Sequence, residues 1–416
     1  MGFYFDMAKI VQIFVPLQIK LSCMDEKIHI EVNCNQKTHW EERICGDVFL
    51  SKRIRSEDRT IIVLSDGMGH GVKANILATL TATMALNFTE EHADYVKTAE
   101  TIINTLPARA EGVSSYATFT IIDINAKNEV AILEYGNPET TIIRGKKVFD
   151  PEWETVTINT EKIYDNEIHF CKFQAYREDR IIFCSDGVTQ SGLGNKYTMG
   201  WGREAVVEYA QKLISDTPDI SASTLAAKIV TMAQNNDMMD LCDDTSCAVV
   251  YFRYPRRLLI CTGPPFDEKN DKQFAQRVAD FKEKIIICGA TTSQIISREL
   301  NRKITYDNEI ADPTLPPISM MEGIELVTEG TITLNRVAQI LKTYKDNHNF
   351  GKGPADLIIK HLLNSEIIDM VVGTKINEAY QDPAMIDHMD IRRDIVKRIV
   401  EVLEEKFMKE TSLQYV

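Results

Sequence analysis

The stretch Ile61-Ile-Val-Leu-Ser-Asp-Gly-Met-Gly-His-Gly71 joins a run of apolar residues to a glycine-rich turn. The apolar run predicts a buried strand, and the glycines predict a turn that ends it. The tripeptide Ser-Asp-Gly at 65–67 returns at 185–187, after the apolar run Ile181-Ile-Phe-Cys184. Two buried strands with the same ending are expected to stop at one rim of the fold, which would bring Asp66 and Asp186 close together.

Two further aspartates adjoin strand-like runs. Asp243 precedes an apolar run that ends at Val250, and Asp47 begins a strand-like segment one strand before Asp66. Carboxylate and carbonyl oxygens are the ligands that Mg²⁺ and Mn²⁺ prefer, and converging aspartates repel one another unless cations lie between them. Two cations about 4 Å apart can activate a water for attack on phosphorus. Any one Asp-Gly pair, taken alone, is equally typical of an ordinary turn.

The four motifs together resemble the metal-dependent protein phosphatases, the PPM or 2C type, and within them the branch of the stage II sporulation protein E. The segments that carry this resemblance are Gly46-Asp47, Ser65-Asp-Gly-Met-Gly-His-Gly71, Ser185-Asp-Gly187, Asp243-Asp-Thr-Ser246, Gly71-Val-Lys-Ala-Asn75 and Glu134-Tyr-Gly-Asn-Pro138. The resemblance covers about 27–252. It implies an α+β fold, a two-sheet β-sandwich flanked by helices, which hydrolyses phosphoserine or phosphothreonine through a hydroxide bridging two metal ions.

The resemblance also implies a role for each aspartate. Asp66 would bridge both ions, Mn²⁺ or Mg²⁺, and the Gly67 carbonyl would bind one of them. Asp186 and Asp243 would hold the other, and these two with Asp66 are the expected catalytic residues. Asp47 would lie beside the second metal, directly or through water. Asp244 matches a variable position and is expected only to support the site.

Some features depart from the family pattern or stay open. Eukaryotic members carry Glu where this chain has Gly46, and they bind phosphate with an N-terminal arginine; Arg43, Lys52 or Arg53 could serve here. His70 is either a general acid or a filler of a variable turn position. Asn137 either lines the metal rim or only forms a turn. Cys45 and Cys184 are expected to be buried apolar residues rather than redox switches.

The chain length of 416 residues predicts two or three domains. Pro255 interrupts a strand-like run and sets the expected boundary, with an extension or edge strand over 1–26, the phosphatase domain over 27–254 and a smaller α/β domain over 255–416. A helix over 72–88 is expected to bury a stripe of large apolar residues, and a charged helix is expected over 390–410. The stripe of the first helix comprises Ile76, Leu77, Leu80, Met84 and Leu86.

The C-terminal half contains the segments Thr262-Gly-Pro-Pro265, Cys288-Gly-Ala-Thr-Thr292 and Val327-Thr-Glu-Gly330. In these segments it resembles the second domain of a group of phosphatases from anaerobes, and we assign it a regulatory or docking role. Gly289-Ala-Thr-Thr-Ser293 opens a helix there, and this turn either binds an anion or is merely capped by Thr292 or Ser293. It lacks the dinucleotide-binding glycine pattern. The acidic residues near His388 are more typical of a polar loop than of a metal site.

The net charge of −14 argues against nucleic acid or an anionic membrane surface as a partner. No apolar run reaches the ~20 residues that span a bilayer, and the nine scattered cysteines favour the cytoplasm. Met1 and Met24 both remain candidate starts. We expect a phosphorylated bacterial regulatory protein as the substrate and a homodimer formed through the helices of the phosphatase domain. The alternatives are a non-catalytic scaffold, or an enzyme whose nucleotide or small phosphate ligand binds the C-terminal half.

Overall fold

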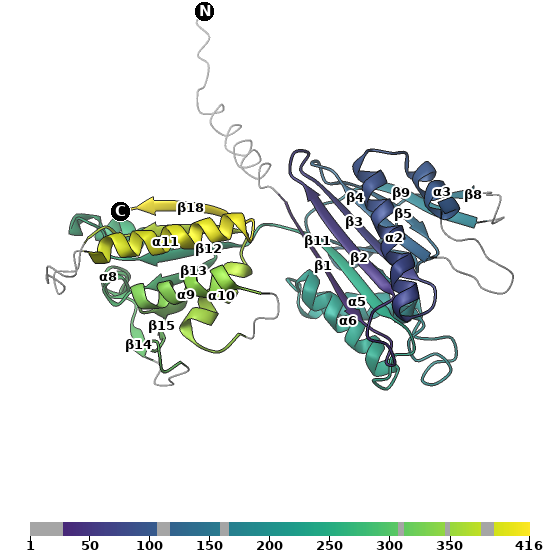
Figure 1. Cartoon of the computed structure of the whole chain (residues 1–416). Coiled ribbons are helices and arrows are strands. Elements are labelled where there is room, and N and C mark those ends of the chain that lie inside the picture. The colour runs from purple at the N-terminus through teal and green to yellow at the C-terminus, as the bar shows by residue number, and fades with distance from the viewer. Residues whose placement is uncertain (1–27, 106–116, 159–165, 307–311, 346–349, 376–386) are drawn as a thin grey trace, which may run out of the picture. The chain divides into compact units, whose positions relative to one another are not determined.

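The computed structural model describes residues 28–105, 117–158, 166–306, 312–345, 350–375 and 387–416 (Figure 1). The chain divides into two compact units, Met1–Tyr254 and Pro255–Val416. The extension expected over 1–26 and the acidic cluster that contains His388 lie outside the residues whose side chains are described. Within the described part of the chain, no helix is long and apolar enough to cross a membrane.

The N-terminal unit contains two sheets of antiparallel strands. The five-stranded sheet has the order β1-β11-β10-β6-β7, and the six-stranded sheet has the order β2-β3-β4-β5-β9-β8. Their strands are β1 (His29–Lys37), β2 (Asp47–Ile54), β3 (Arg59–Gly67), β4 (Ala117–Ile124), β5 (Glu129–Tyr135), β6 (Thr141–Arg144), β7 (Lys147–Phe149), β8 (Trp153–Ile158), β9 (Asn166–Gln174), β10 (Asp179–Cys184) and β11 (Thr245–Arg253).

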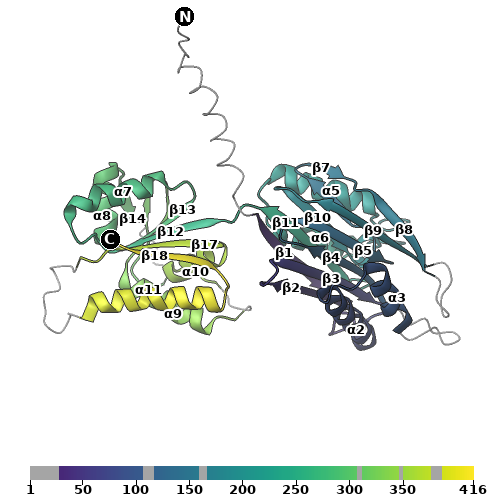
Figure 2. The same ribbon diagram turned by 90° about the horizontal axis from the view of Figure 1, so that it is seen from above.

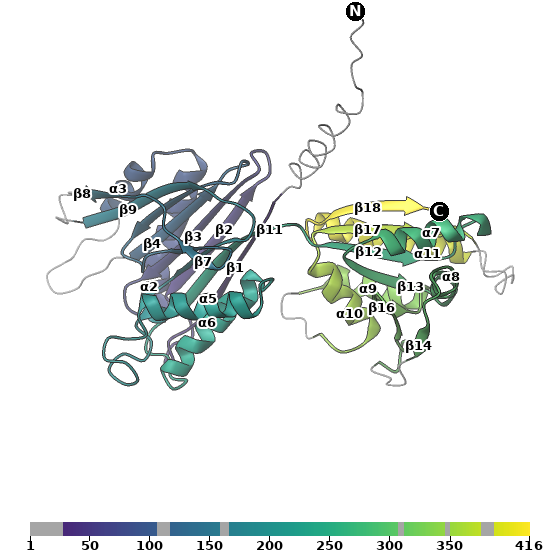
Figure 3. The same ribbon diagram turned by 180° about the vertical axis from the view of Figure 1, so that it is seen from behind.

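The two sheets pack face to face, because every second residue of their central strands is apolar and buried between them, as with Ile62, Ile122 and Val250. Helices α2 (Gly71–Glu90) and α3 (Tyr95–Thr105) cover the six-stranded sheet. Helices α5 (Arg203–Asp216) and α6 (Ala222–Asn236) cover the five-stranded sheet (Figure 3). The predicted β-sandwich flanked by helices is confirmed.

Helix α2 corrects one expectation. Its buried face is made of small residues, Ala74, Ala78, Ala82 and Ala85, and not of the large ones. Ile76 is 60% exposed, and Leu80 lies on the same open side, so their assignment to the buried stripe is wrong. Alanines let the helix approach the sheet closely. Leu77, Met84 and Leu86 do pack partly against the core.

The C-terminal unit is built on one seven-stranded sheet, with the order β14-β15-β16-β13-β12-β17-β18. Strands β16, β13, β12, β17 and β18 are parallel to one another, whereas β15 is antiparallel to both β14 and β16. The strands are β12 (Arg257–Thr262), β13 (Lys284–Cys288), β14 (Ile304–Tyr306), β15 (Ser319–Met321), β16 (Ile324–Thr328), β17 (Ile367–Val372) and β18 (Glu410–Tyr415). The chain enters this sheet at the central strand β12 and adds later strands on both sides of it, which is the arrangement of a doubly wound α/β sheet.

Helices lie on both faces of this sheet (Figure 2). Helices α7 (Asp271–Asp280) and α8 (Ala290–Leu300) bury their apolar side chains on one face. Helices α9 (Thr331–Thr343), α10 (Pro354–Leu363) and α11 (Asp387–Glu405) cover the other. The smaller α/β unit predicted after the sandwich has this architecture.

Strands β6 and β7 form a hairpin that turns at Gly145 with φ 62°. One expected element differs from the structure. The helix expected over 390–410 ends at Glu405, and the chain then forms β18 alongside β17. The extra strand arises because β17 offers an open edge for pairing, which no local pattern in the sequence reveals.

Candidate functional site

Four aspartates converge at one end of the sandwich. Asp47 and Asp66 lie opposite each other in neighbouring strands β2 and β3. Asp186 begins the short helix α4 (Asp186–Thr189) after β10, and Asp243 lies just before β11. Burial and the charges of the other three raise the pKa of Asp66 to about 10. The structure thus brings all four predicted carboxylates into one acidic cluster.

Asp47 forms the buried floor of this cluster. Its Oδ2 accepts hydrogen bonds from Ser185 Oγ at 2.8 Å and Ser246 Oγ at 2.5 Å. Its Oδ1 is buried and has no hydrogen-bond partner within the described residues. Burial raises the pKa of Asp47 to about 7, against the lowering effect of the two serines. A buried carboxylate oxygen without a donor is costly, so it favours a cation or an ordered water beside it.

Asp186 and Asp243 form the more open side of the cluster. Burial raises the pKa of Asp243 to about 6, and the charge of Asp186 adds to that increase. Burial also raises the pKa of Asp186. Gln190 Nε2 donates to Asp186 Oδ2 at 2.8 Å and so fixes that carboxylate one helical turn away.

The two Ser-Asp-Gly turns depend on the absence of a side chain at their glycines. A Cβ on Gly67 would overlap the Ala74 carbonyl oxygen of α2. A Cβ on Gly187 would overlap the Asp244 carbonyl oxygen. Glycine therefore lets α2 and the segment before β11 approach the two turns and hold Asp66 and Asp186 near each other.

Asp244 positions the loop that precedes β2. Its Oδ1 accepts the His39 backbone N–H at 3.0 Å, and its Oδ2 accepts the Gly46 backbone N–H at 2.8 Å. Both oxygens are thus engaged and the residue is buried. This agrees with a supporting role. Sequence reasoning did not find its two partners, because they lie about 200 residues away along the chain.

A second missed feature is the group around His70. His70 Nδ1 lies 2.9 Å from Glu42 Oε1, and its ring stacks on His39 with centroids 4.4 Å apart. His70 is close enough for its charge to lower the pKa of Asp243, although burial dominates there. The three side chains join the loop before β2 to the glycine-rich turn at the rim of the acidic cluster.

The structure separates the candidate phosphate-binding residues. Lys52 pairs with Glu90 and Arg53 pairs with Asp58, toward the end of β2 that lies away from Asp47. Arg43 is exposed in the loop next to Glu42. Of the three, only Arg43 therefore lies on the loop that borders the acidic cluster.

The remaining candidates at the rim have structural surroundings. Asn137 bonds to Thr118 and to Thr120 Oγ1, which fastens its turn to β4. Cys184 is buried, and burial raises its pKa to about 12. Burial likewise raises the pKa of Cys45. Neither thiol is in the anionic form that redox chemistry needs.

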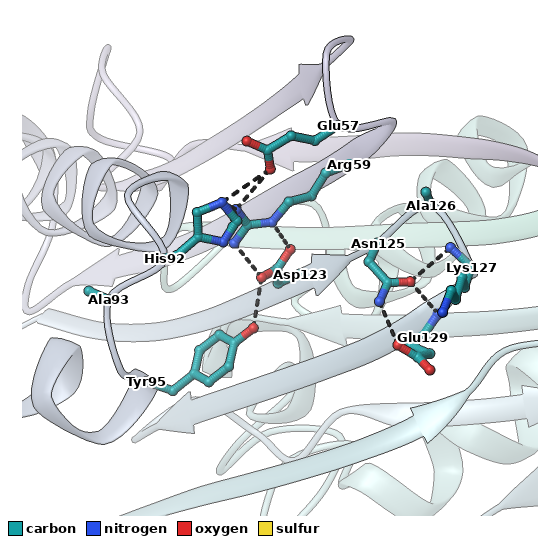
Figure 4. Close-up of a pocket in the computed structure, with 10 residues that line it drawn as sticks. All are labelled: Glu57, Arg59, His92, Ala93, Tyr95, Asp123, Asn125, Ala126, Lys127 and Glu129. Carbon is teal, nitrogen blue, oxygen red and sulfur yellow. Dashed lines mark hydrogen bonds and ion pairs between the residues drawn. The ribbon is translucent and has the colours of Figure 1, made fainter.

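A polar pocket of about 440 Å³ lies at the opposite end of β3 (Figure 4). The Arg59 guanidinium there donates to both carboxylate oxygens of Asp123, at 2.8 and 2.7 Å, and to the Thr89 carbonyl at 2.6 Å. Tyr95 Oη donates to Asp123 Oδ2 at 2.7 Å. These groups satisfy one another and anchor the C-terminal end of α2, so we assign this pocket a structural role.

The donor set of the acidic cluster suits hard divalent cations. Oxygen ligands carry the excess negative charge, and one buried oxygen of Asp47 lacks a donor. In the described residues, no three His, Cys, Asp or Glu side chains already have the arrangement of a finished metal site. The carboxylates would therefore adjust around a cation as it bound.

The comparisons with known proteins give a family for most of the N-terminal unit. Residues 56–253 match the family model described as stage II sporulation protein E (SpoIIE). This segment is a SpoIIE-family domain of the PPM type, a class of metal-dependent protein serine/threonine phosphatases, as the motifs predicted. A comparison with curated proteins gives no match.

Solved structures of phosphatase domains are distantly similar. The SpoIIE phosphatase domain from Bacillus subtilis, in a crystal form without domain swapping, is 16% identical, with 55% of this chain and 94% of that chain covered and a TM-score of 0.42. A SpoIIE structure with a regulatory fragment, also from Bacillus subtilis, is 17% identical (55% and 63% covered, TM-score 0.44). The catalytic domain of the phosphatase PstP in complex with two manganese ions is 14% identical (54% and 99%, TM-score 0.36). The family assignment rests on the family model and the motifs.

Proposed function

We propose that the chain is a Mn²⁺- or Mg²⁺-dependent phosphatase that hydrolyses phosphoserine or phosphothreonine in a bacterial regulatory protein in the cytoplasm. One observation carries the proposal: Asp66 lies among three other carboxylates that, together with burial, raise its pKa to about 10. Such a concentration of like charge is unfavourable unless cations neutralise it. Two divalent cations bound at this place would activate a water for the hydrolysis of a phosphoester.

The residues of the cluster would share the work of holding two cations. Asp66, Asp186 and Asp243, with the Gly67 carbonyl, would be the ligands, and Asp47 would lie beside them. When bound, the cations would supply Lewis acidity toward water and the phosphoryl oxygens. The chain's own part is orientation: Ser185 and Ser246 hold Asp47, and Gln190 holds Asp186.

The exposed face of α2 supports a homodimer that forms through the helices of the phosphatase domain. Val72, Ile76 and Leu80 are spaced four residues apart and are 55%, 60% and 44% exposed. Such a row forms one apolar stripe along a helix. Burial of this stripe by a second copy would remove it from water. We expect Ile76→Ser to shift the chain from dimer to monomer in sedimentation, and a monomeric wild-type chain would contradict this part of the proposal.

The proposed activity is tested with p-nitrophenyl phosphate and a phosphoserine peptide in the presence of Mn²⁺. The wild type is compared with Asp66→Asn and Asp186→Asn, each with and without EDTA. Asp216→Asn is the matched control, because Asp216 is exposed at the end of α5, outside the acidic cluster. We expect turnover only in the wild type and the control, and only without EDTA. Stoichiometric Mn²⁺ binding without turnover would instead favour a non-catalytic scaffold.

A further inference from the structure

We propose that the C-terminal unit carries a second binding site, which takes the phosphate group of a small molecule at the N-terminus of α8. The site lies at the carboxyl edge of the parallel sheet, where the turns after β12 and β13 meet. It is independent of the acidic cluster and of the proposed phosphatase activity.

The topology places this edge at the position where doubly wound sheets bind ligands. β12 is the first strand of the sheet in the chain and pairs with both β13 and β17. The helices that follow β12 and β13 pack on one face, and the helix that follows β17 packs on the other. The chain therefore changes face beside β12, and ligands of such sheets bind at the carboxyl ends of the strands at this switch point.

The turns that contain Gly263, Gly289 and Gly330 meet at Gly289, and these three glycines place no side chain between them. A Cβ on Gly289 would lie 4.0 Å from the Gly263 backbone nitrogen, and a Cβ on Gly330 would lie 3.4 Å from the Gly289 Cα. Gly263 and Gly289 have φ values of 80° and 130°, which side-chain-bearing residues rarely adopt. The backbone is thereby open to close approach by a ligand.

The first turn of α8 has N–H groups that the described residues leave unused. Gly289 is the N-cap and offers no side chain, and the backbone N–H groups of Ala290 and Thr291 have no partner there. Ala290 is exposed, so solvent reaches this turn. A helix N-terminus with free N–H groups favours an anion.

Helix α9 provides the internal contrast. Its first turn is covered by the Glu329 carboxylate, whose Oε2 accepts the N–H groups of Ile332 at 3.0 Å and Thr333 at 3.2 Å. At α9, therefore, the protein supplies its own anion. At α8, an anion would have to come from outside.

A buried hydroxyl at the same turn points to a ligand independently of the helix end. Thr292 Oγ1 is buried, has no hydrogen-bond partner among the described residues, and would lie 3.1 Å from a Cβ on Gly289. It therefore faces the turn. Thr262 Oγ1, at the end of β12, is also buried and has no partner in the described part of the chain. A buried unpaired hydroxyl is unfavourable, and a phosphate oxygen that accepts its hydrogen bond would relieve this.

Arg392 adds the positive charge. It lies against Gly263, where an added Cβ would overlap its Nη1, and that nitrogen donates to the Gly373 carbonyl oxygen at 3.3 Å. Burial lowers the pKa of Arg392, and the charge of Glu329 acts against that lowering, but the two side chains form no ion pair among the described residues. A guanidinium has five N–H donors, so most of them remain for an anion.

The test uses the full chain in EDTA, so that divalent cations do not occupy the acidic cluster. Binding of inorganic phosphate and, separately, of ADP is measured by calorimetry. Ala290→Asp places a carboxylate at the free turn of α8 and should not harm the helix, because acidic residues stabilise a first turn. Gln339→Asp adds the same charge at an exposed position of α9, more than two turns away from Gly330. We expect Ala290→Asp to weaken binding at least tenfold and Gln339→Asp to leave it unchanged.

Two further variants separate the hydroxyl from the charge. Thr292→Val keeps the side-chain shape and Arg392→Met keeps most of its apolar stem, and both should weaken binding without changing the melting temperature by more than a few degrees. Tighter binding of ADP than of phosphate would identify a nucleotide as the source of the phosphate group, and equal binding would identify free phosphate. The proposal is wrong if neither probe binds at about 10 mM, or if Ala290→Asp binds like the wild type.

Discussion

The two ends of strand β3 differ in the charges that surround their buried carboxylates. At one end, Asp66 lies among other aspartates, and their charges add to burial in raising its pKa to about 10. At the other end, Asp123 is buried against the Arg59 guanidinium, which donates to both of its oxygens. In the part of the chain that the structure describes, no lysine or arginine forms an ion pair with Asp66, whereas Asp123 has Arg59 as its counter-charge. We call the Asp66 end incomplete and the Asp123 end complete.

This difference separates a functional site from a structural junction better than pocket shape does. The Arg59 pocket is well formed, but its polar groups already satisfy one another. The acidic cluster leaves charge and one buried Asp47 oxygen unsatisfied. Unsatisfied polar groups in a folded chain favour a partner from outside, and this supports our proposal that the functional site is at the Asp66 end.

The largest effect is expected at the complete end. Asp123→Asn should destabilise the chain by about 3 kcal/mol, because buried Arg59 would lose its nearer counter-charge and keep the Glu57 carboxylate at 3.4 Å. Combining Asp123→Leu with Arg59→Met should recover part of that loss. Urea denaturation of the three proteins measures it. Equal stability of Asp123→Asn and the wild type would mean that the ion pair does not anchor α2.

The incomplete end should respond to cations. Mn²⁺ at 100 times its dissociation constant should stabilise the wild type by about 2.7 kcal/mol, since it binds the folded cluster and not the unfolded chain. Thermal unfolding with and without Mn²⁺ measures the shift. Asp66→Asn should lose most of it, whereas the exposed-site variant Asp216→Asn should keep it. A shift of the same size in Asp66→Asn would place the cation elsewhere.

Glu134 is a third buried carboxylate, and its surroundings are intermediate between those of Asp66 and Asp123. It is buried in β5 and accepts the Thr140 N–H at 2.8 Å, and burial raises its pKa to about 7. The folded chain therefore holds this proton more tightly than the unfolded chain does. Its contribution to stability is full below about pH 4.5 and is lost as the pH rises toward 7.

Glu134→Gln should remove this pH dependence. At pH 8 the variant should be more stable than the wild type, by on the order of 2 kcal/mol, and at pH 4.5 the two should be close. Unfolding free energies at both pH values test this. If the difference in unfolding free energy between the wild type and the variant is the same at pH 8 as at pH 4.5, Glu134 ionises in the folded chain at little cost.

The smallest effect returns to Asp66. In EDTA near neutral pH, Asp66→Asn should raise the stability of the chain by about 1 kcal/mol, because the folded wild type must keep a proton on Asp66 that the unfolded chain releases. The same variant is expected to be inactive. Chemical denaturation in EDTA measures the gain, and a loss of stability would mean that the carboxylate has a structural partner.

The sequence alone located much of the site. Asp66 and Asp186 follow apolar runs with the same tripeptide, so their placement at strand ends was readable from local pattern and turn chemistry. The family also followed from the motifs, because it depends on residue types at fixed positions. These features are short-range, and short-range patterns are written directly in the chain.

Only the tertiary structure decided the rest. Helix α2 packs its alanine face on the sheet and leaves Ile76 and Leu80 exposed, because the close fit near Gly67 leaves no space for large side chains. Residues 410–415 form a strand because the edge of β17 is open for pairing. The fold engages Asp244 with His39 and Gly46 and brings Gly263, Gly289 and Gly330 together. Each of these outcomes depends on contacts between segments far apart in the chain, which a local pattern cannot specify.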